Sequence, residues 1–292
     1  MAIAIKFYHP GDERRINQAD LNRGICSWNK GNHQRKYFAV QGSYLTSLNS
    51  GVKYGQIGFW GEWEAESAIK VTGNLKTNSN NAYPTFIHVP IIPEFTPKNT
   101  ASGGVHQNTD PCVFGDNYFY TLCKQRKRSG RPSYLNNLQI GDVIIFGSQR
   151  VGVFVVDTVF VIGDQVRYNI GNMKTILSSK VPNWYFNLTL NHIPNNGDYN
   201  LYIGATYTKP IDGMFSFFPC VSGNLVDTGF LRPPALAPFH SKQTQGTKRL
   251  NNGNSNLTTS SIWNCVVQEV LNSGLSLGLM ANLSKDSWGQ KE

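Results

Sequence analysis

Long apolar runs and charged residues are both scarce in this chain of 292 residues. No stretch approaches the roughly 18 consecutive apolar residues of a membrane-spanning helix. The N-terminal segment soon becomes charged and its apolar part is too short for a secretory signal, so we expect a cytoplasmic protein that contacts no membrane. Charged side chains make up only 15% of the chain, below the usual quarter. Glycine, asparagine and aromatic residues take their place, which is typical of strand-rich proteins with long polar loops.

Cysteine is also rare, and its distribution excludes two common scaffolds. The five cysteines are odd in number and widely scattered, so they fit neither a disulfide framework nor a zinc site. The sequence also lacks a Walker loop, a dinucleotide fingerprint, an HExxH motif and a histidine pair at metal spacing. We therefore expect neither a cofactor nor a metal.

Positive charge is the first feature that is present in excess. The formal net charge is +9 and the pI is near 9.3, which favours an anionic partner such as nucleic acid. A hydrophobic content of 40% is enough for a substantial core in a chain of this length. We expect a single domain over residues 1–292, with long polar loops at 93–109 and 240–259.

Strand-like segments dominate the pattern along the chain. They are rich in Val, Ile, Phe and Tyr and are bounded by Gly, Asn and Pro. The expected strands lie at 3–8, 56–66, 85–89, 142–147, 151–162, 198–207 and 214–219, and the fourth and fifth form an antiparallel pair. One helix is clear at 260–274, where Ser260 and Ser261 can cap an apolar stripe. We expect a β-rich α+β protein: a curved mixed or antiparallel sheet or partial barrel, with few helices and a C-terminal helix packed on it.

The segment 108–131, NTDPCVFGDNYFYTLCKQRKRSGR, concentrates reactive, aromatic and basic side chains. Its second half is a loop without an acidic residue, and such a loop can neutralise several phosphates of a nucleic acid. The predicted phosphate-binding residues are Lys124, Arg126, Lys127, Arg128 and Arg131. A solvated surface loop without a partner is the alternative.

Carboxylates in the same segment are candidates for cleavage of an N-glycosidic bond. The reaction passes through a cationic, oxocarbenium-like sugar that a carboxylate can stabilise. Asp110 is the first choice for this role, and Asp116 is the reserve. The alternative for Asp110, which precedes a proline, is a structural role as the cap of a turn. Lys124 is a further catalytic candidate, because a lysine with a lowered pKa can form a Schiff base. Cys123 could act as a nucleophile if a histidine met it in space, although packing is its expected role.

A second candidate group lies in the segment GFWGEWEAES at 58–67. On an extended strand, Glu64 would share one face with Glu62 and Glu66, and its neighbours would raise its pKa for general acid or base catalysis. The favoured alternative is an edge strand whose acids face solvent and pair with basic residues. Trp60 and Trp63 fit a wall on which a base could stack.

Three further residues complete the predicted site or its surroundings. Tyr120 can join the stacking wall, and the amide of Gln125 can hydrogen-bond to a base edge, unless it is a satisfied core glutamine. Asp157 lies alone in an apolar strand, so it must be paired, hydrogen-bonded or functional.

Two resemblances bear on the function. The segment LNNLQIGDVIIFGS resembles the strand entry of small β-barrels of the PUA, ASCH and EVE class. The segments HVP, TDPCVFG, CKQ, GDVIIFGS, VVDTVFV and MFSFFPC, in this order over 85–220, resemble a poorly characterised prokaryotic family found among nucleotide-modification and antiviral systems. This second resemblance implies interplay with modified DNA, including excision of bulky phage bases by a DNA glycosylase.

We therefore expect an enzyme of the DNA glycosylase type that acts on a flipped, modified base, with DNA as its partner. The alternative is a reader of the PUA or EVE kind that grips a flipped base without reaction. A third possibility is a transferase or hydrolase that acts on free nucleotides.

Overall fold

The computed structural model is β-rich, with two sheets that share the core. It describes residues 2–9, 11–30, 33–70, 83–94, 108–150, 152–192, 197–234, 246–251 and 257–283. The first sheet has six strands in the order β12 (Gly246–Arg249), β1 (Ala4–Tyr8), β8 (Val143–Arg150), β9 (Val153–Tyr168), β10 (Tyr199–Gly204) and β7 (Phe119–Tyr120). Only β1 and β8 pair in parallel, so the sheet is mixed.

The second sheet has seven strands and closes on itself at one end. Its order is β13 (Ser276–Ala281), β11 (Phe218–Ser222), β4 (Lys53–Gly61), β3 (Lys36–Leu45), β6 (Ile87–Pro90), β5 (Ser67–Lys70) and β2 (Ile25–Cys26). Strand β13 also pairs with β3, so β3, β4, β11 and β13 form a small closed barrel. The expected β-rich α+β class with a curved sheet is therefore confirmed.

Closure of the barrel depends on a glycine at the contact of β3 with β13. A Cβ atom at Gly42 would lie 2.3 Å from the carbonyl oxygen of Met280, which is closer than real atoms approach. The register of β13 shifts between Gly278 and Met280 on the same pair of strands. Such a bulge bends a strand and lets it serve two neighbours.

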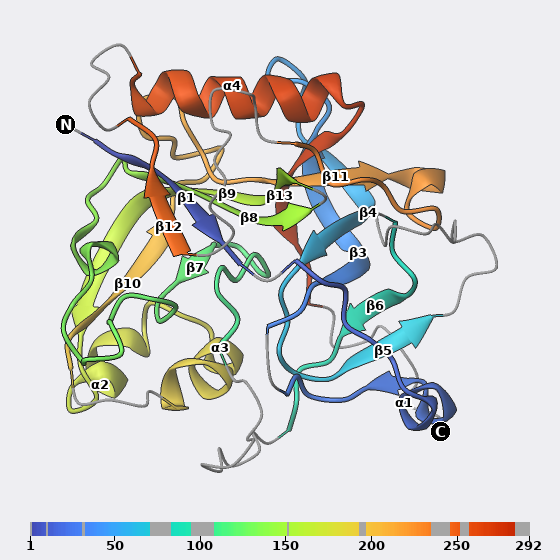
Figure 1. Cartoon of the computed structure of the whole chain (residues 1–292), viewed down its shortest axis with the longest axis horizontal. Helices are drawn as coiled ribbons and strands as arrows, with labels where there is room; N and C mark the ends of the chain where they lie inside the picture. Colours follow the sequence, from blue (N-terminus) through green and yellow to red (C-terminus); the bar gives the residue numbers. More distant parts are fainter. Residues whose placement is uncertain are drawn as a thin grey trace.

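Four α-helices lie within the described residues. They are α1 (Gln18–Arg23), α2 (Met173–Leu177), α3 (Asn183–Leu188) and α4 (Thr259–Asn272), together with short 3-10 turns at Tyr134–Asn137, Leu190–His192 and Gly223–Leu225. Helix α4 runs along one side of the sheets (Figure 1) and buries Ile262, Val266 and Val270. This confirms the expected C-terminal helix. Its cap is Thr258, whose side chain accepts a hydrogen bond from the Ser261 amide, rather than Ser260 or Ser261.

The strand pattern was predicted well where apolar residues are dense and poorly elsewhere. The antiparallel pairing of β8 with β9 is confirmed. Strand β4 ends at Gly61, so residues 62–66 are irregular rather than extended, and β11 begins at Phe218 rather than near residue 214. Strands β3, β12 and β13 were missed, as were the short strands β2, β5 and β7. Strand β12 falls in the expected loop 240–259; residues 240–245 and 252–256 of that loop, and 95–107 of the loop 93–109, lie outside the described residues.

None of the helices in the described part of the chain combines the length and the apolar character that crossing a membrane requires.

Candidate functional site

A buried ionic network joins the two sheets, and Arg35 lies at its centre. Arg35 precedes β3 and is only 1% exposed. Its guanidinium donates from Nε to Asp157 Oδ2 at 2.9 Å and from Nη1 to Glu62 Oε2 at 2.6 Å. Asp157 belongs to β9 of the first sheet, whereas Glu62 follows β4 of the second. Because an unpaired buried charge is costly, this arginine fixes the two sheets to each other.

The end of the network at Asp157 is fully paired. Its Oδ1 accepts from Arg232 at 3.2 Å, and its Oδ2 accepts from Ser148 at 3.1 Å as well as from Arg35. Burial opposes ionisation, but Arg232 and Arg35 outweigh it and hold the pKa of Asp157 below its usual value. The isolated acid of the apolar strand is therefore a paired structural residue.

The other end contains two glutamates that share one imidazole. His33 Nδ1 lies 2.9 Å from Glu62 Oε1 and 2.6 Å from Glu64 Oε1. Glu62 and Glu64 are 3% and 0% exposed, whereas the His33 side chain is 22% exposed. Glu64 Oε2 is buried and has no hydrogen-bond partner within the described residues. The sequence favoured solvent-facing acids here, and that expectation is wrong, because the chain turns inward after Gly61.

The surroundings drive the pKa values of the two glutamates apart. At Glu62, burial opposes ionisation, but His33, His9 and Arg35 outweigh it and hold the pKa well below its usual value. At Glu64, burial prevails and raises the pKa to about 6. Burial disfavours the charged form of His33, yet the two carboxylates outweigh it and raise its pKa to about 11. Near neutral pH the proton therefore lies on His33, which donates it in a hydrogen bond to Glu64, the carboxylate that titrates closest to neutrality, and Glu62 stays ionised beside them.

A second histidine adjoins Glu62, and a thiol adjoins that histidine. His9, which follows β1, places Nδ1 at 3.0 Å from Glu62 Oε2. Its Nε2 lies 3.5 Å from the Sγ atom of Cys123. From the sequence, Cys123 could act as a nucleophile only if a histidine lay close to it in space. The structure meets this condition with His9, a histidine that the sequence did not single out.

The set also offers ligand atoms for a cation. One atom each of His33, Glu62 and Glu64 lies within 4.8 Å of the others, and nitrogen with carboxylate oxygen suits zinc, manganese or iron. The proton on His33 Nδ1 competes for the same two oxygens. The arrangement can therefore exchange protons, and it can hold a divalent cation only if His33 gives up its proton.

Asp110, the first candidate in the sequence, organises a turn. It is fully buried and accepts the amides of Thr121, Leu122 and Cys123 at 3.0, 2.7 and 2.8 Å. Burial raises its pKa to about 6 in spite of these hydrogen bonds. Its three shortest hydrogen bonds come from backbone amides of the turn that carries Cys123, and the Asn108 side-chain amide donates a longer one at 3.4 Å. We therefore correct its role from charge stabilisation at a sugar to positioning of that turn. Asp116 is exposed, and no contact joins it to the network among the described residues.

The predicted base-binding residues lie in the core, so the expected stacking wall is corrected. Trp60 and Trp63 are 1% and 0% exposed, and their indole nitrogens donate to the carbonyl oxygens of Phe230 and Glu66. Tyr120 donates its hydroxyl to the Cys123 carbonyl oxygen. These rings have packing neighbours on their faces, such as the Arg232 guanidinium 4.6 Å above the Trp60 ring, and leave no open face for a base.

Gln125 is the satisfied core glutamine that the sequence left as an alternative. It is fully buried, its Nε2 donates to the Asn200 carbonyl oxygen, and its Oε1 accepts from the Asn200 amide and the Asn136 side chain. Lys124 is exposed, and its Nζ lies 5.3 Å from the centre of the Phe7 ring. A lysine in such an exposed position is not desolvated as Schiff-base chemistry requires, so we correct this assignment as well.

The basic loop, residues 124–131, reaches the surface directly after Cys123. Lys124, Lys127, Arg128 and Arg131 are exposed. Arg126 differs, because its guanidinium donates to the Asp198 carbonyl oxygen at 3.1 Å and lies 5.7 Å from the Tyr199 ring centre. Four of the five predicted phosphate ligands are therefore available to a partner, and the fifth anchors the loop.

Sequence reasoning missed His9, His33 and Arg35. His9 directly follows β1, Arg35 directly precedes β3, and His33 lies three residues before β3, in the short segments HPG and NHQRKYF where the chain leaves or enters a sheet. Charged and imidazole groups flanking apolar strands are a usable signal. The partners that make them a site come from distant parts of the chain.

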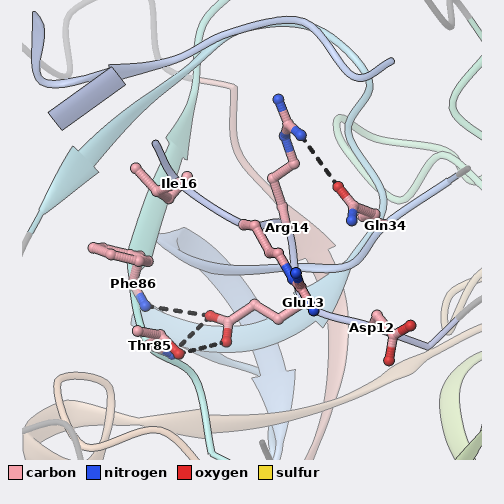
Figure 2. Close-up of a pocket in the computed structure, with 8 residues that line it drawn as sticks. Asp12, Glu13, Arg14, Ile16, Gln34, Thr85 and Phe86 are labelled. Carbon is pink, nitrogen blue, oxygen red and sulfur yellow. Dashed lines mark hydrogen bonds between the residues drawn. The ribbon is translucent and has the colours of Figure 1, made fainter. Parts of the chain in front are cut away.

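A polar pocket of about 580 Å³ is lined in part by Glu13, Arg14 and Gln34. These residues are close in sequence to the network residues His9, His33 and Arg35. In Figure 2 the Glu13 carboxylate turns toward Thr85 and Phe86, and Arg14 toward Gln34. The carboxylate accepts both backbone amides and the Thr85 hydroxyl. The Glu13 and Arg14 side chains are thus hydrogen-bonded to other residues that line the pocket. The candidate reactive groups lie in the buried network, not in this pocket.

No family model, no curated protein and no solved structure matches this chain, so its function has to be argued from the network itself.

Proposed function

We propose that the protein is a hydrolase of the DNA glycosylase type, which removes a modified base through the pair of glutamates at His33. Glu62 is the ionised carboxylate that stabilises positive charge developing on the sugar. His33 and Glu64 hold the proton that the departing base requires. The basic loop binds the phosphates on either side of the target nucleotide.

The observation that carries this proposal is the sharing of one imidazole by two buried carboxylates, at 2.9 and 2.6 Å. Titratable groups of one kind whose surroundings push their pKa values apart are typical of acid and base pairs in enzymes. A merely structural cluster would leave few buried polar atoms unpaired, yet Glu64 Oε2 has no partner in the described residues.

His33 is the member of the group through which a substrate would make contact. Its side chain is 22% exposed, whereas the side chains of Glu62 and Glu64 are 2% and 0% exposed. We therefore assign His33 the contact with the leaving base. Glu64 supplies and recovers the proton behind it.

The place of the basic loop in the chain, directly after Cys123, supports an anionic polymer as substrate. Cys123, within 3.5 Å of His9, is followed immediately by the exposed cations of the basic loop. A nucleotide held at the network would thus have cations beside its backbone, which is the usual means of positioning DNA without reading its sequence.

The test is incubation of the purified protein with DNA that contains or lacks modified bases, followed by alkali. Scission at modified positions is the expected result, because alkali cleaves the abasic sites that a glycosylase leaves. Glu64→Gln should reduce the rate by about 100-fold or more, as loss of a general acid or base usually does. Glu66→Gln is the matched control, since Glu66 lies two residues further on and outside the network, and it should keep the activity.

Other outcomes separate the alternatives. Tight binding without scission would identify a reader of modified bases, and activity on free nucleotides alone would identify a nucleotide-directed enzyme. Activity that a chelator abolishes and a divalent cation restores would assign His33, Glu62 and Glu64 to a metal rather than to a shared proton.

A further inference from the structure

Cys123, His9 and Glu62 form a row in which only Glu62 has a role in the proposed glycosidic cleavage. The Sγ atom of Cys123 lies 3.5 Å from His9 Nε2, and His9 Nδ1 lies 3.0 Å from Glu62 Oε2. This is the order of nucleophile, base and orienting carboxylate that recurs in enzymes with covalent intermediates. The three residues lie far apart in the chain and meet only in the folded protein.

The imidazole of His9 is held so that one nitrogen faces the thiol. Its ring packs edge-on against Phe7 and Phe146, with centres 4.5 and 5.6 Å away. Glu62 is ionised and accepts a hydrogen bond from Nδ1, so the lone pair of the neutral ring lies on Nε2.

The Cys123 thiol is carried by a turn that hydrogen bonds hold in place. Asp110 accepts the Cys123 amide at 2.8 Å, and the Gln125 amide donates to the Leu122 carbonyl oxygen at 3.2 Å. Lys124, inside this turn, has φ of 57°, a left-handed conformation that is unfavourable for a residue with a Cβ atom. Strain of this kind is tolerated where the surroundings enforce it, and it is concentrated at active sites.

Among the five cysteines, Cys123 alone has this setting. Cys26, Cys112 and Cys220 are buried, and Cys265 is exposed on α4. Cys123 is partly exposed as a residue, directly before the exposed basic loop. Burial, followed by Asp110 and Glu62, raises the pKa of its thiol well above the usual value. The sulfur is therefore a protonated thiol at rest, which needs the adjacent base for attack.

We propose that Cys123 is a catalytic nucleophile toward a carbonyl carbon, with His9 as its general base and Glu62 as the residue that orients His9. The substrate class is an amide or ester carried by an anionic molecule; only its anionic character rests on the function proposed above. A carbonyl suits a thiol because the resulting thioester is readily hydrolysed, whereas a thioglycoside at a sugar carbon is not.

The reaction balances without a further reagent. The thiol proton passes to His9 Nε2 as sulfur bonds to the carbonyl carbon. The leaving nitrogen or oxygen takes this proton when its bond to carbon breaks, which leaves a thioester on Cys123. Water then gives a proton to His9 and attacks the thioester, and the thiolate that departs recovers the proton. The sum is one amide or ester plus water, giving an acid and an amine or alcohol.

The experiment uses p-nitrophenyl acetate as the probe on the full-length protein. We expect a burst of nitrophenolate equal to the protein concentration and one acetyl group on the peptide of Cys123. Acylation of Cys123 should be at least about 10-fold faster than acylation of the exposed Cys265, because only Cys123 has a base beside it. Cys265→Ser should keep the burst, and Cys123→Ser should abolish it.

His9→Asn should slow acylation of Cys123 by about 10-fold or more while acylation of Cys265 stays unchanged. Equal rates at the two cysteines of the wild-type protein would overturn the proposal, even if the His9 variant does not fold. An unchanged rate in a folded His9→Asn protein would overturn it as well. Cys123→Ser should still excise bases and Glu64→Gln should still give the burst, so failure of one function is distinguishable from failure of the other.

Discussion

Both ends of the buried ionic network consist of buried carboxylates and the cations that compensate them, but the two ends differ in how completely the carboxylates are paired. At Asp157, two arginines and a serine satisfy both carboxylate oxygens. At Glu64, a single histidine serves two carboxylates, and one oxygen lacks a partner in the described residues. Arg35 touches Asp157 and Glu62, so both ends share one central cation.

This difference separates structural charge from chemical charge. A carboxylate between two arginines stays ionised at any ordinary pH and can only hold its neighbours in place. A carboxylate that shares a proton can change state near neutral pH, which catalysis requires. The carboxylates are thus buried at both ends, and the two ends differ in the cations that compensate this burial.

Asp157→Asn should break the structural end and have the largest effect on stability. The change leaves Arg35 and Arg232 without their shared carboxylate, and removal of one partner from a buried pair costs about 3–5 kcal/mol. Denaturant unfolding measures the loss. Asp164→Asn, an exposed position on the same strand, should change stability by less than about 0.5 kcal/mol. Similar losses in both variants would remove the distinction between the two ends.

Glu64→Gln should have the opposite pattern of effects: a small change in stability and a large loss of activity. A neutral amide replaces a carboxylate whose burial already disfavours its charge, so we expect unfolding free energy to change by less than about 1 kcal/mol. Base excision should nevertheless fall by about 100-fold or more. Parallel unfolding and activity measurements on one preparation decide this, and a variant that loses stability as strongly as Asp157→Asn would contradict it.

The shared proton should make stability depend on pH above neutrality. The folded pKa of His33 is raised from 6.5 to about 11, so its contribution is complete below pH 6.5 and is lost as pH rises toward 11. Glu64, with a pKa raised to about 6, contributes in the same direction at lower pH. Between pH 7 and 9 the wild type should lose up to about 1.4 kcal/mol per pH unit relative to a His33→Gln, Glu64→Gln double variant. Coinciding profiles from denaturant unfolding at several pH values would contradict a proton held at this site.

The basic loop should show the smallest effect, confined to binding. Replacing Lys127, Arg128 and Arg131 with alanine should reduce the slope of log affinity against log salt by about 0.9 for each phosphate that the loop no longer neutralises. Fluorescence anisotropy with duplex DNA at several salt concentrations measures the slope. Alanines at Lys174, Lys180 and Lys209, which are exposed elsewhere, provide a control of equal charge. Equal slopes for the two triple variants would remove the loop from the interface.

Local patterns were enough to predict much of the fold. The apolar density of 142–162 identified the pairing of β8 with β9, and helical spacing identified α4. Strand β3 was missed because Gln41, Gly42 and Ser43 interrupt its apolar run, and the reason for Gly42 is its contact with β13. A residue whose identity is set by a distant strand has no local pattern to reveal it.

The site divides in the same way. The sequence alone determined that residues 62–64 and 108–131 are unusual, because acids, indoles and cations in such density are visible in the order of residues. Which of them react was decided by the tertiary structure, since Asp110 became a backbone acceptor, Trp60 and Trp63 became core, and two histidines from other segments joined Glu62. The physical reason is that protonation and nucleophilicity depend on burial and on neighbours within a few ångströms. Those neighbours are fixed only when the two sheets meet.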